Sequence, residues 1–367
     1  MNQGIEIGIP RERKPEEQRV ALVPEAVGEL VRDGHRVRVE SGAGAGSGYG
    51  DEAFRAAGAE VVASAEELYA SRLILKVKEP IPEEYDLYRS DHVLFSFLHL
   101  AAVPELAAFL QERGVTAFAF ETLEDDSGRL PLLAPMSAIA GKVAAQYAIT
   151  LLHAPQGGKG LLLGGAPGTE RGRVAVLGAG VVGSNAAALL SAAGARVDVL
   201  DLDLDRAEDL AKHGPGQITG LYPYRDTVSE AVRQADVVVG AVLSPGARAP
   251  TVVSREQVAA MGPGSVIADV AVDQGGCIET TRPTDYIQPT FVEEGVIHFA
   301  VTNIPAAVPL SASRSLSARL LPYAKKLARM PLNDLEGAVG QAPDMDAALN
   351  VVRGGIHHEG VAASLSG

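Results

Sequence analysis

The chain has 367 residues, 47% of them hydrophobic, which is enough apolar material for two packed domains. Its formal net charge of −14 argues against binding to nucleic acid or to an anionic membrane surface and favours a soluble protein. The single cysteine, Cys277, cannot form a disulfide within the chain, so a reducing compartment and a packed, unreactive thiol are expected. No secretory leader or bilayer-spanning run is recognisable, and we expect a cytoplasmic protein.

The N-terminal part alternates short apolar runs with amphipathic stretches, a pattern typical of a parallel β/α sheet. Helices are opened by residues such as Pro24, which suits an early helical position. The glycine-rich segment 42–48 is interpreted as a flexible loop, with a phosphate cradle as the alternative. The expected strands are 5–9, 36–39, 72–77, 92–98 and 116–120, and the expected helices are 24–32, 51–57, 65–70 and 103–113.

A second α/β unit follows a long helix expected over residues 136–152. Its strands would form a six-stranded, doubly wound sheet. The chain after residue 310 is expected to form a helix over 311–330 and a tail without strands, and to pack on the first domain. Residues 138–307 would then be a dinucleotide-binding domain inserted into a substrate domain of residues 1–137 and 308–367, with a ligand cleft between them. The expected strands of the second sheet are 173–177, 196–200, 217–219, 236–241, 265–270 and 296–301.

A glycine fingerprint formed by Gly178, Gly180 and Gly183 follows the strand 173–177 and opens a helix. The first glycine turns the chain, the second lets backbone approach a pyrophosphate, and the third lets helix and strand pack closely. Asp201, at the end of the next strand, is placed to accept hydrogen bonds from the adenosine ribose and to repel a 2′-phosphate. The spacing therefore predicts NAD as the cofactor, while Arg206 keeps NADP as an alternative.

Two cationic side chains are candidates for holding a substrate carboxylate. Arg19 follows the first strand, and its guanidinium can bind a carboxylate through two parallel hydrogen bonds. Lys78 lies at the carboxyl end of its strand, the edge at which open α/β sheets bind ligands. The alternatives are a surface arginine, and an ordinary ion pair of Lys78 with Glu79 or Glu83.

Two further side chains suit proton transfer. His99 ends an apolar strand and titrates near neutral pH, although a lone histidine in such surroundings is more often a packed core residue. Asp273 follows a strand in a tight turn, where it can orient water or protonate an amine, with turn capping as the alternative. The adjacent His357 and His358 have no second ligand pair at useful spacing, so no metal site is expected and the pair is interpreted as exposed.

Together these segments resemble the alanine dehydrogenase family, which is grouped with the NAD-binding subunit of transhydrogenase. The resemblance implies NAD-dependent oxidation of L-alanine to pyruvate and ammonia by a two-domain subunit of a homohexamer. The family often has methionine at the position of Ile304, a conservative apolar difference. The similar motifs follow one order along the chain, at residues 8–10, 19–21, 75–80, 97–100, 131–137, 178–183, 240–246, 273–277 and 302–305.

The resemblance also assigns expected roles to individual residues. Arg19 and Lys78 would hold the substrate carboxylate, and Met136 would lie near the substrate methyl group. His99 and Asp273 would transfer protons as water attacks the imine. The residues expected to line the cofactor are Ser137, Gly178, Gly180, Val182, Gly183, Asp201, Arg206, Val242, Leu243, Val270 and Asn303.

Two rival functions have a similar plan. The NAD(H)-binding component of proton-pumping transhydrogenase would leave Arg19, Lys78, His99 and Asp273 without a purpose. An enzyme for a larger amino acid, of the lysine or saccharopine type, would need a further charged contact, and none is obvious beside Met136.

Overall fold

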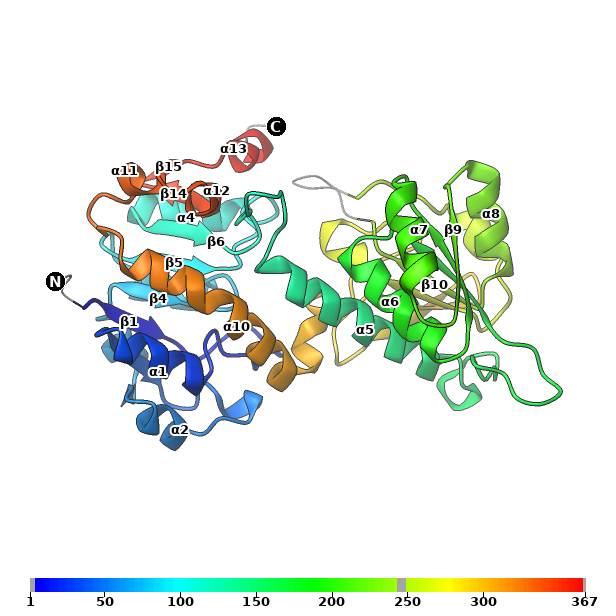
Figure 1. Ribbon diagram of the computed structural model, residues 1–367, viewed down its shortest axis with the longest axis horizontal. Helices are drawn as coiled ribbons and strands as arrows, with labels where there is room; N and C mark the ends of the chain where they lie inside the picture. The colour runs from blue at the N-terminus through cyan, green and yellow to red at the C-terminus, as the bar shows by residue number, and fades with distance from the viewer. Residues whose placement is uncertain (1–3, 243–248, 366–367) are drawn as a thin grey trace. The chain divides into compact units, whose positions relative to one another are not determined.

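The computed structural model describes residues 4–242 and 249–365, which divide into two compact units. Unit 1 comprises Met1–Met136 and Val308–Gly367, and unit 2 comprises Ser137–Ala307. Each unit is a sheet flanked by helices (Figure 1). The expected fold class, two mostly parallel doubly wound sheets, is confirmed.

Within the described residues, the sheet of unit 1 has eight strands in the order β15-β14-β6-β5-β4-β1-β2-β3. Strands β1 to β6 run parallel, whereas β14 and β15 add an antiparallel hairpin at one edge. The strands are β1 (Glu6–Ile9), β2 (Arg36–Glu40), β3 (Glu60–Val62), β4 (Leu73–Leu75), β5 (Val93–Ser96), β6 (Thr116–Ala119), β14 (Leu349–Val352) and β15 (Gly355–Ile356).

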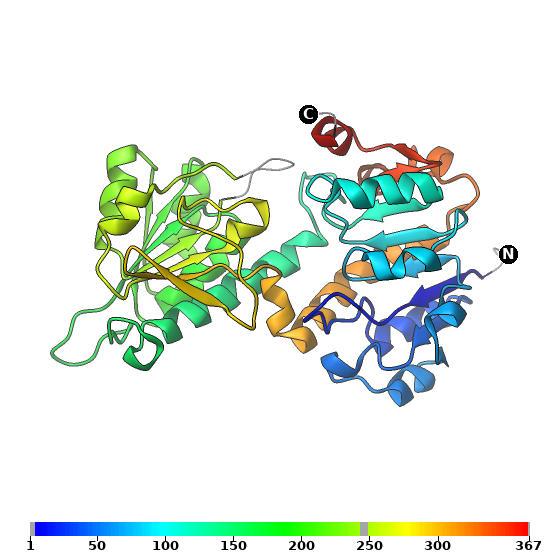
Figure 2. The same ribbon diagram turned by 180° about the vertical axis from the view of Figure 1, so that it is seen from behind.

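Helices cover both faces of this sheet. Helices α1 and α10 lie over one face in Figure 1, and α4 lies over the other face, seen from behind in Figure 2. The helices are α1 (Pro24–Arg32), α2 (Asp51–Ala56), α3 (Ala65–Leu68), α4 (Pro104–Arg113), α10 (Pro309–Ala328), α11 (Leu335–Val339), α12 (Pro343–Ala348), α13 (Glu359–Leu365), and the 3-10 helices η1 (Ala45–Ser47) and η2 (Pro82–Leu87).

The sheet of unit 2 has seven strands within the described part of the chain, in the order β12-β13-β11-β10-β7-β8-β9. Only β12 is antiparallel to its neighbour. The strands are β7 (Arg173–Leu177), β8 (Arg196–Leu200), β9 (Gln217–Leu221), β10 (Val237–Gly240), β11 (Val266–Asp269), β12 (Thr290–Glu293) and β13 (Val296–Phe299). The helices are α5 (Leu133–Leu151), which begins in unit 1, α6 (Val181–Ala192), α7 (Leu204–His213), α8 (Arg225–Gln234), α9 (Arg255–Ala259), η3 (Ala154–Gln156), η4 (Val270–Gln274) and η5 (Ile304–Ala307).

Two expectations about strands are wrong for the same physical reason. The tail after residue 310 contains the hairpin β14–β15, and the sheet of unit 2 gains a seventh strand through the hairpin β12–β13. Each hairpin turns through a non-glycine residue followed by glycine, both with positive φ: Arg353 at 51° and Gly354 at 77°, Glu294 at 51° and Gly295 at 76°. Such turns suit two-residue hairpins, but Arg and Glu are unusual in them, so the sequence signal is weak.

The segment 42–48 is not the flexible loop that its glycines suggest. It contains η1, and the buried hydroxyl of Ser47 hydrogen-bonds Ser313 of α10 at 2.8 Å and donates to the carbonyl of Gln18 at 3.0 Å. These hydrogen bonds hold the segment against α10, because a buried hydroxyl is stable only when it has hydrogen-bond partners.

In each sheet, the order in which the chain adds parallel strands reverses once. The parallel strands run β3-β2-β1-β4-β5-β6 in unit 1 and β9-β8-β7-β10-β11-β13 in unit 2, so the chain switches between β1 and β4 and between β7 and β10. Open α/β sheets bind ligands in the crevice beyond the carboxyl ends of the strands at such a switch.

Among the described residues, no helix is both long and apolar enough to cross a membrane.

Candidate active site

The three glycines of the fingerprint meet three different surroundings. A Cβ atom on Gly183 would lie 1.8 Å from the carbonyl oxygen of Gly178, and one on Gly178 would lie 2.7 Å from that of Ala241. Gly178 also has a φ of 101°, which favours glycine. For Gly180, in contrast, no described heavy atom lies within 4 Å of that position. Gly180 is therefore not required for packing, and it leaves open the space that a pyrophosphate needs at the N-terminus of α6.

Asp201 follows β8 and faces the glycine turn. Its carboxylate accepts hydrogen bonds from the backbone N–H groups of Ala179 and, at 2.7 Å, of Asp203. Asp201 therefore ties the loop after β8 to the glycine turn and is half-buried there. Arg206 is exposed in the first turn of α7, and its Nε lies 3.0 Å from the carboxylate of Asp203.

The other residues expected to line the cofactor lie on several elements of unit 2. Val242 follows β10, at the switch point, and Val270 begins η4 after β11. Asn303 precedes η5 with a φ of 60°. The remaining residues are Val182 in the first turn of α6 and Ser137 in α5, whereas Leu243 lies outside the described residues.

Asp269 and Asp273 have different surroundings. The strand β11 ends at Asp269, which is buried and accepts hydrogen bonds from the N–H groups of Ala271 (3.1 Å) and Cys277 (3.0 Å) and the hydroxyl of Thr281 (2.7 Å). Asp273 lies beyond the strand in the short 3-10 helix η4 and is exposed. Asp269 thus holds the backbone of the loop that presents Asp273.

Arg19 is not a surface arginine: only 2% of its side chain is exposed. Glu17, which is also buried, binds the guanidinium through two oxygens, with 2.7 Å between Nε and Oε1. The remaining nitrogen, Nη1, lies 3.3 Å from the sulfur of Met136. The structure therefore brings together Arg19 and Met136, and a carboxylate that sequence reasoning missed fixes the orientation of the arginine.

Lys78 lies three residues beyond β4 and takes part in the expected type of ion pair. Its Nζ lies 3.7 Å from Oε2 of Glu79, which also contacts Lys14. Burial alone would raise the pKa of Glu79, but the charges of Lys78 and Lys14 outweigh it and lower the pKa. The backbone N–H of Lys78 donates to the carboxylate of Glu12 at 3.3 Å. The neighbour Lys76 is fully buried in other ion pairs.

His99 follows β5, which is the strand next to β4 in the sheet. Its backbone is held in an unusual conformation. Its φ is 50°, and its N–H donates to the carboxylate of Glu121 at 2.6 Å. The same carboxylate accepts from the N–H of Leu98, and its Oε1 lies 3.9 Å from Nδ1 of His99. The imidazole ring is half-buried and stacks on Phe97. Backbone strain of this kind is common at functional sites, and Glu121 is a second residue that the sequence did not reveal.

The interpretation of His357 and His358 as exposed is wrong. Both are half-buried, and Nε2 of His357 lies 3.0 Å from the carboxylate of Asp346. In the part of the chain that is described, no group of three or more His, Cys, Asp or Glu side chains is placed to hold a metal ion. Cys277 is buried, and burial together with the charge of Asp269 raises the pKa of its thiol well above the usual value.

The structure defines an α/β protein of the dinucleotide-binding class. Unit 2 carries the glycine turn and Asp201, and unit 1 carries the buried cationic side chains of Arg19 and Lys78. Family models describe both parts: "Alanine dehydrogenase/PNT, N-terminal domain" matches residues 8–140, and "Alanine dehydrogenase/PNT, C-terminal domain" matches residues 144–359. The chain belongs to the alanine dehydrogenase/PNT family, and NAD(H) is the cofactor of that family.

The chain is similar to curated relatives and to solved structures over nearly its whole length. The chain is 47% identical to the alanine dehydrogenase of Bacillus subtilis strain 168 over 98% of this chain and 94% of that protein. It is 43% identical to the alanine dehydrogenase of Mycobacterium tuberculosis CDC 1551 / Oshkosh over 98% and 97%. A solved L-alanine dehydrogenase matches with a TM-score of 0.93 at 44% identity over 99% of both chains. A transhydrogenase from Sinorhizobium meliloti matches with a TM-score of 0.81 at 28% identity over 96% and 99%.

Proposed function

We propose that this protein is an NAD-dependent L-alanine dehydrogenase, which oxidises L-alanine to pyruvate and ammonia and also catalyses the reverse reaction. The observation that carries the proposal is the cationic site at the switch point of unit 1, where the buried Arg19 is oriented by Glu17 and Lys78 follows the neighbouring strand. A module that only passes electrons between nucleotides has no need for a site of this kind. The alanine dehydrogenases that match over the full chain support the same substrate.

Substrate binding follows from the charges and shapes of this site. Arg19 and Lys78 hold the carboxylate of alanine, because a guanidinium and an ammonium together offer both direction and charge. Met136, whose sulfur contacts Arg19, borders the space for the small side chain of the substrate. A thioether is apolar and adaptable, so it suits a methyl group better than a charged substituent.

Proton transfer is assigned to His99 and Asp273. NAD, when bound, supplies the two-electron oxidant, and the overall reaction converts L-alanine, NAD and water into pyruvate, ammonium, NADH and a proton. His99 takes a proton from the water that attacks the imine carbon and returns it to the departing amine. Glu121 orients His99 through its backbone N–H and lies near Nδ1. Asp273, presented by the Asp269-bound loop, takes part in the same proton transfers.

The cofactor is assigned to the switch point of unit 2. The glycine turn and the start of α6 receive the pyrophosphate, and Asp201 binds the adenosine ribose. The open space at Gly180 and the position of Asp201 beside the turn support this assignment. The further residues proposed to line the cofactor are Ser137, Val182, Arg206, Val242, Leu243, Val270 and Asn303.

Further proposals concern assembly and location. We infer a homohexamer, as the family resemblance implies, and a cytoplasmic location, which suits a chain whose single cysteine is buried.

A panel assay tests the proposed function. NADH formation from NAD is measured with single L-amino acids, and NADP replaces NAD in a parallel series. The expected result is that L-alanine gives the fastest NADH formation, that pyruvate with ammonia reverses it, and that Arg19→Lys raises the KM for alanine far more than the KM for NAD. Silence on every amino acid, together with hydride exchange between two nucleotides, would support a transhydrogenase component and refute the proposal.

A further inference from the structure

Unit 1 contains a group of charged side chains that includes Arg19 and Lys78 and that the proposed chemistry does not use in full. We call it the charge cluster. Its members follow β1 and β4 or lie in η2, and all of them are buried except Lys14, whose side chain is 35% exposed. The cations are Lys14, Arg19, Lys76 and Lys78, and the anions are Glu12, Glu17, Glu79 and Glu84.

Glu12 is the member that links the two strands at the switch point. It follows β1, and its carboxylate accepts hydrogen bonds from the backbone N–H groups of Val77 at 2.7 Å and Lys78 at 3.3 Å, just beyond β4. Nζ of Lys76 lies 3.7 Å from the same carboxylate. Glu12 therefore fixes the backbone that carries Lys78, and its carboxylate lies beside the ammonium group of Lys76.

The groups around Glu12 leave its charge only partly compensated. Lys76 is shared with Glu84, and the negative charge of Glu17 also faces Glu12. Burial is the largest effect and, with the two carboxylates, raises the pKa of Glu12 to about 7 against the opposing charge of Lys76.

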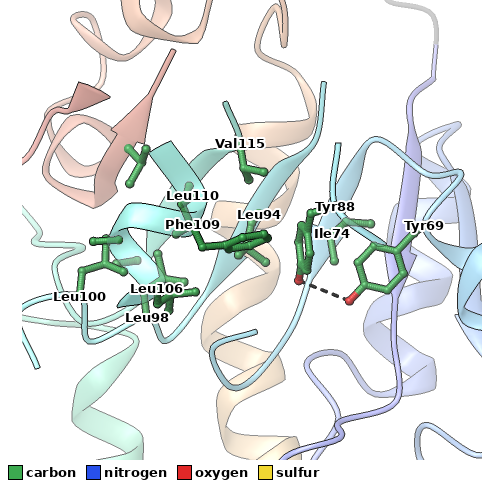
Figure 3. Close-up of a cluster of buried hydrophobic side chains, with 14 of the residues drawn as sticks. Tyr69, Ile74, Tyr88, Leu94, Leu98, Leu100, Leu106, Phe109, Leu110 and Val115 are labelled. Carbon is green, nitrogen blue, oxygen red and sulfur yellow. Dashed lines mark hydrogen bonds between the residues drawn. The ribbon is translucent and has the colours of Figure 1, made fainter. Parts of the chain in front are cut away.

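Tyr69 and Tyr88 also lie near Glu12, and neither supplies a positive charge that would compensate its carboxylate. The hydroxyls of Tyr69 and Tyr88 point toward each other, 3.3 Å apart, at the edge of the apolar cluster in Figure 3. Burial raises the pKa of both tyrosines, so they stay neutral. Burial therefore favours the protonated form of Glu12, while the adjacent charge of Lys76 favours the ionised form.

The charge balance of the cluster depends on that ionisation. With Glu12 ionised, the four cations and four anions of the cluster cancel. With Glu12 protonated, the cluster carries one net positive charge, which matches the single carboxylate of the substrate. Buried charges interact strongly because little water screens them, so an incoming carboxylate favours the protonated form.

We propose that Glu12 is a positioning residue of the substrate-carboxylate site, and that it takes up a proton when the carboxylate of the substrate binds beside Arg19 and Lys78. This inference rests on the proposed function, because it requires a monocarboxylate at that site. The affinity for pyruvate then falls as pH rises above the pKa of free Glu12, by up to about tenfold per pH unit.

Isothermal titration calorimetry tests the proposal directly. Pyruvate is titrated into NAD-loaded protein without ammonia at pH 7.5, in two buffers that differ in ionisation enthalpy, so that the difference in heat gives the number of protons taken up. If binding raises the pKa by about one unit, the wild-type protein takes up about half a proton more than Glu12→Gln. Glutamine resembles the protonated carboxyl and keeps an acceptor for Val77, so this variant is expected to fold. Glu83→Gln, an exposed position in η2, is the matched control and keeps the uptake of the wild type.

Each outcome has a distinct meaning. Equal proton uptake by wild type and Glu12→Gln would overturn the proposal, even if both bind pyruvate. Binding of pyruvate without any uptake by the wild type would overturn it as well, while leaving the proposed function intact. No binding of pyruvate by the wild type would refute the proposed function itself. If Glu12→Gln does not fold, the infrared difference spectrum of wild-type protein with ¹³C-labelled glutamate decides: a protonated glutamate band must gain intensity when pyruvate binds.

Discussion

The glycine fingerprint allows packing and ligand binding to be separated by one methyl group. Alanine at position 183 would bring Cβ to 1.8 Å from a backbone carbonyl oxygen, which no side-chain rotation can relieve. Overpacking of this kind costs roughly 3 kcal/mol or more. For a unit the size of unit 2, that cost lowers the melting temperature by about 6–12 °C. Alanine at position 180 meets no described heavy atom within 4 Å and should leave the melting temperature within about 2 °C of the wild type.

The two variants should therefore have different effects: Gly183→Ala should lower the melting temperature, and Gly180→Ala should weaken cofactor binding. Gly180→Ala fills the space assigned to the pyrophosphate, so we expect NADH to bind at least about tenfold more weakly, a loss of roughly 1.4 kcal/mol. NADH fluorescence gives the affinity, and differential scanning calorimetry without cofactor gives the stability. The reasoning would be refuted by Gly180→Ala binding NADH as the wild type does, or by Gly183→Ala melting at the wild-type temperature.

Three further predictions concern charged and titratable groups of unit 1. Glu17→Gln leaves the guanidinium of Arg19 buried without its counter-charge, so the free energy of unfolding should fall by about 3–5 kcal/mol in denaturant titrations; a loss below about 1 kcal/mol would contradict the role of this ion pair. Glu121→Gln weakens a charge-assisted hydrogen bond to the backbone of His99, so kcat should fall about tenfold with the KM for NAD unchanged, and an unaltered kcat would be inconsistent with that role. Burial lowers the pKa of His92 to about 4, so below pH 6.5 the unfolded chain binds a proton that the folded unit does not. Stability should then fall by up to about 3 kcal/mol as the pH drops from 6.5 to 4, and His92→Gln should flatten this dependence; identical pH profiles would argue against it.

The sequence predicts the parallel strands and the main helices well because periodicity and glycines specify them locally. Helix α1 spans Pro24–Arg32, the range expected from its opening proline and apolar spacing. Strand β7, the glycine turn and α6 follow the expected order. Strand β12 and the hairpin β14–β15 are not evident in the sequence because these strands are short and lie at or next to a sheet edge, and their pairing depends on tertiary context.

The candidate site was predicted only in part, for a related reason. Arg19, Lys78 and His99 stand out because charged residues at strand ends suggest ligand binding. Glu12 and Glu17 lie in a strongly polar stretch that looks like exposed surface, and only the folded structure shows that they are buried against cations. The available signal was position: Glu12 follows the strand at which the topology reverses, where a polar side chain faces the ligand crevice.

The origin of the hydrogen transferred to the cofactor tests the central claim most directly. L-alanine carrying deuterium at Cα is oxidised in the presence of NAD, and the product NADH is examined by mass spectrometry. An L-alanine dehydrogenase must deliver that deuterium to NADH, with pyruvate formed in equal amount. NADH without deuterium, or no NADH from alanine at all, would contradict the proposed function.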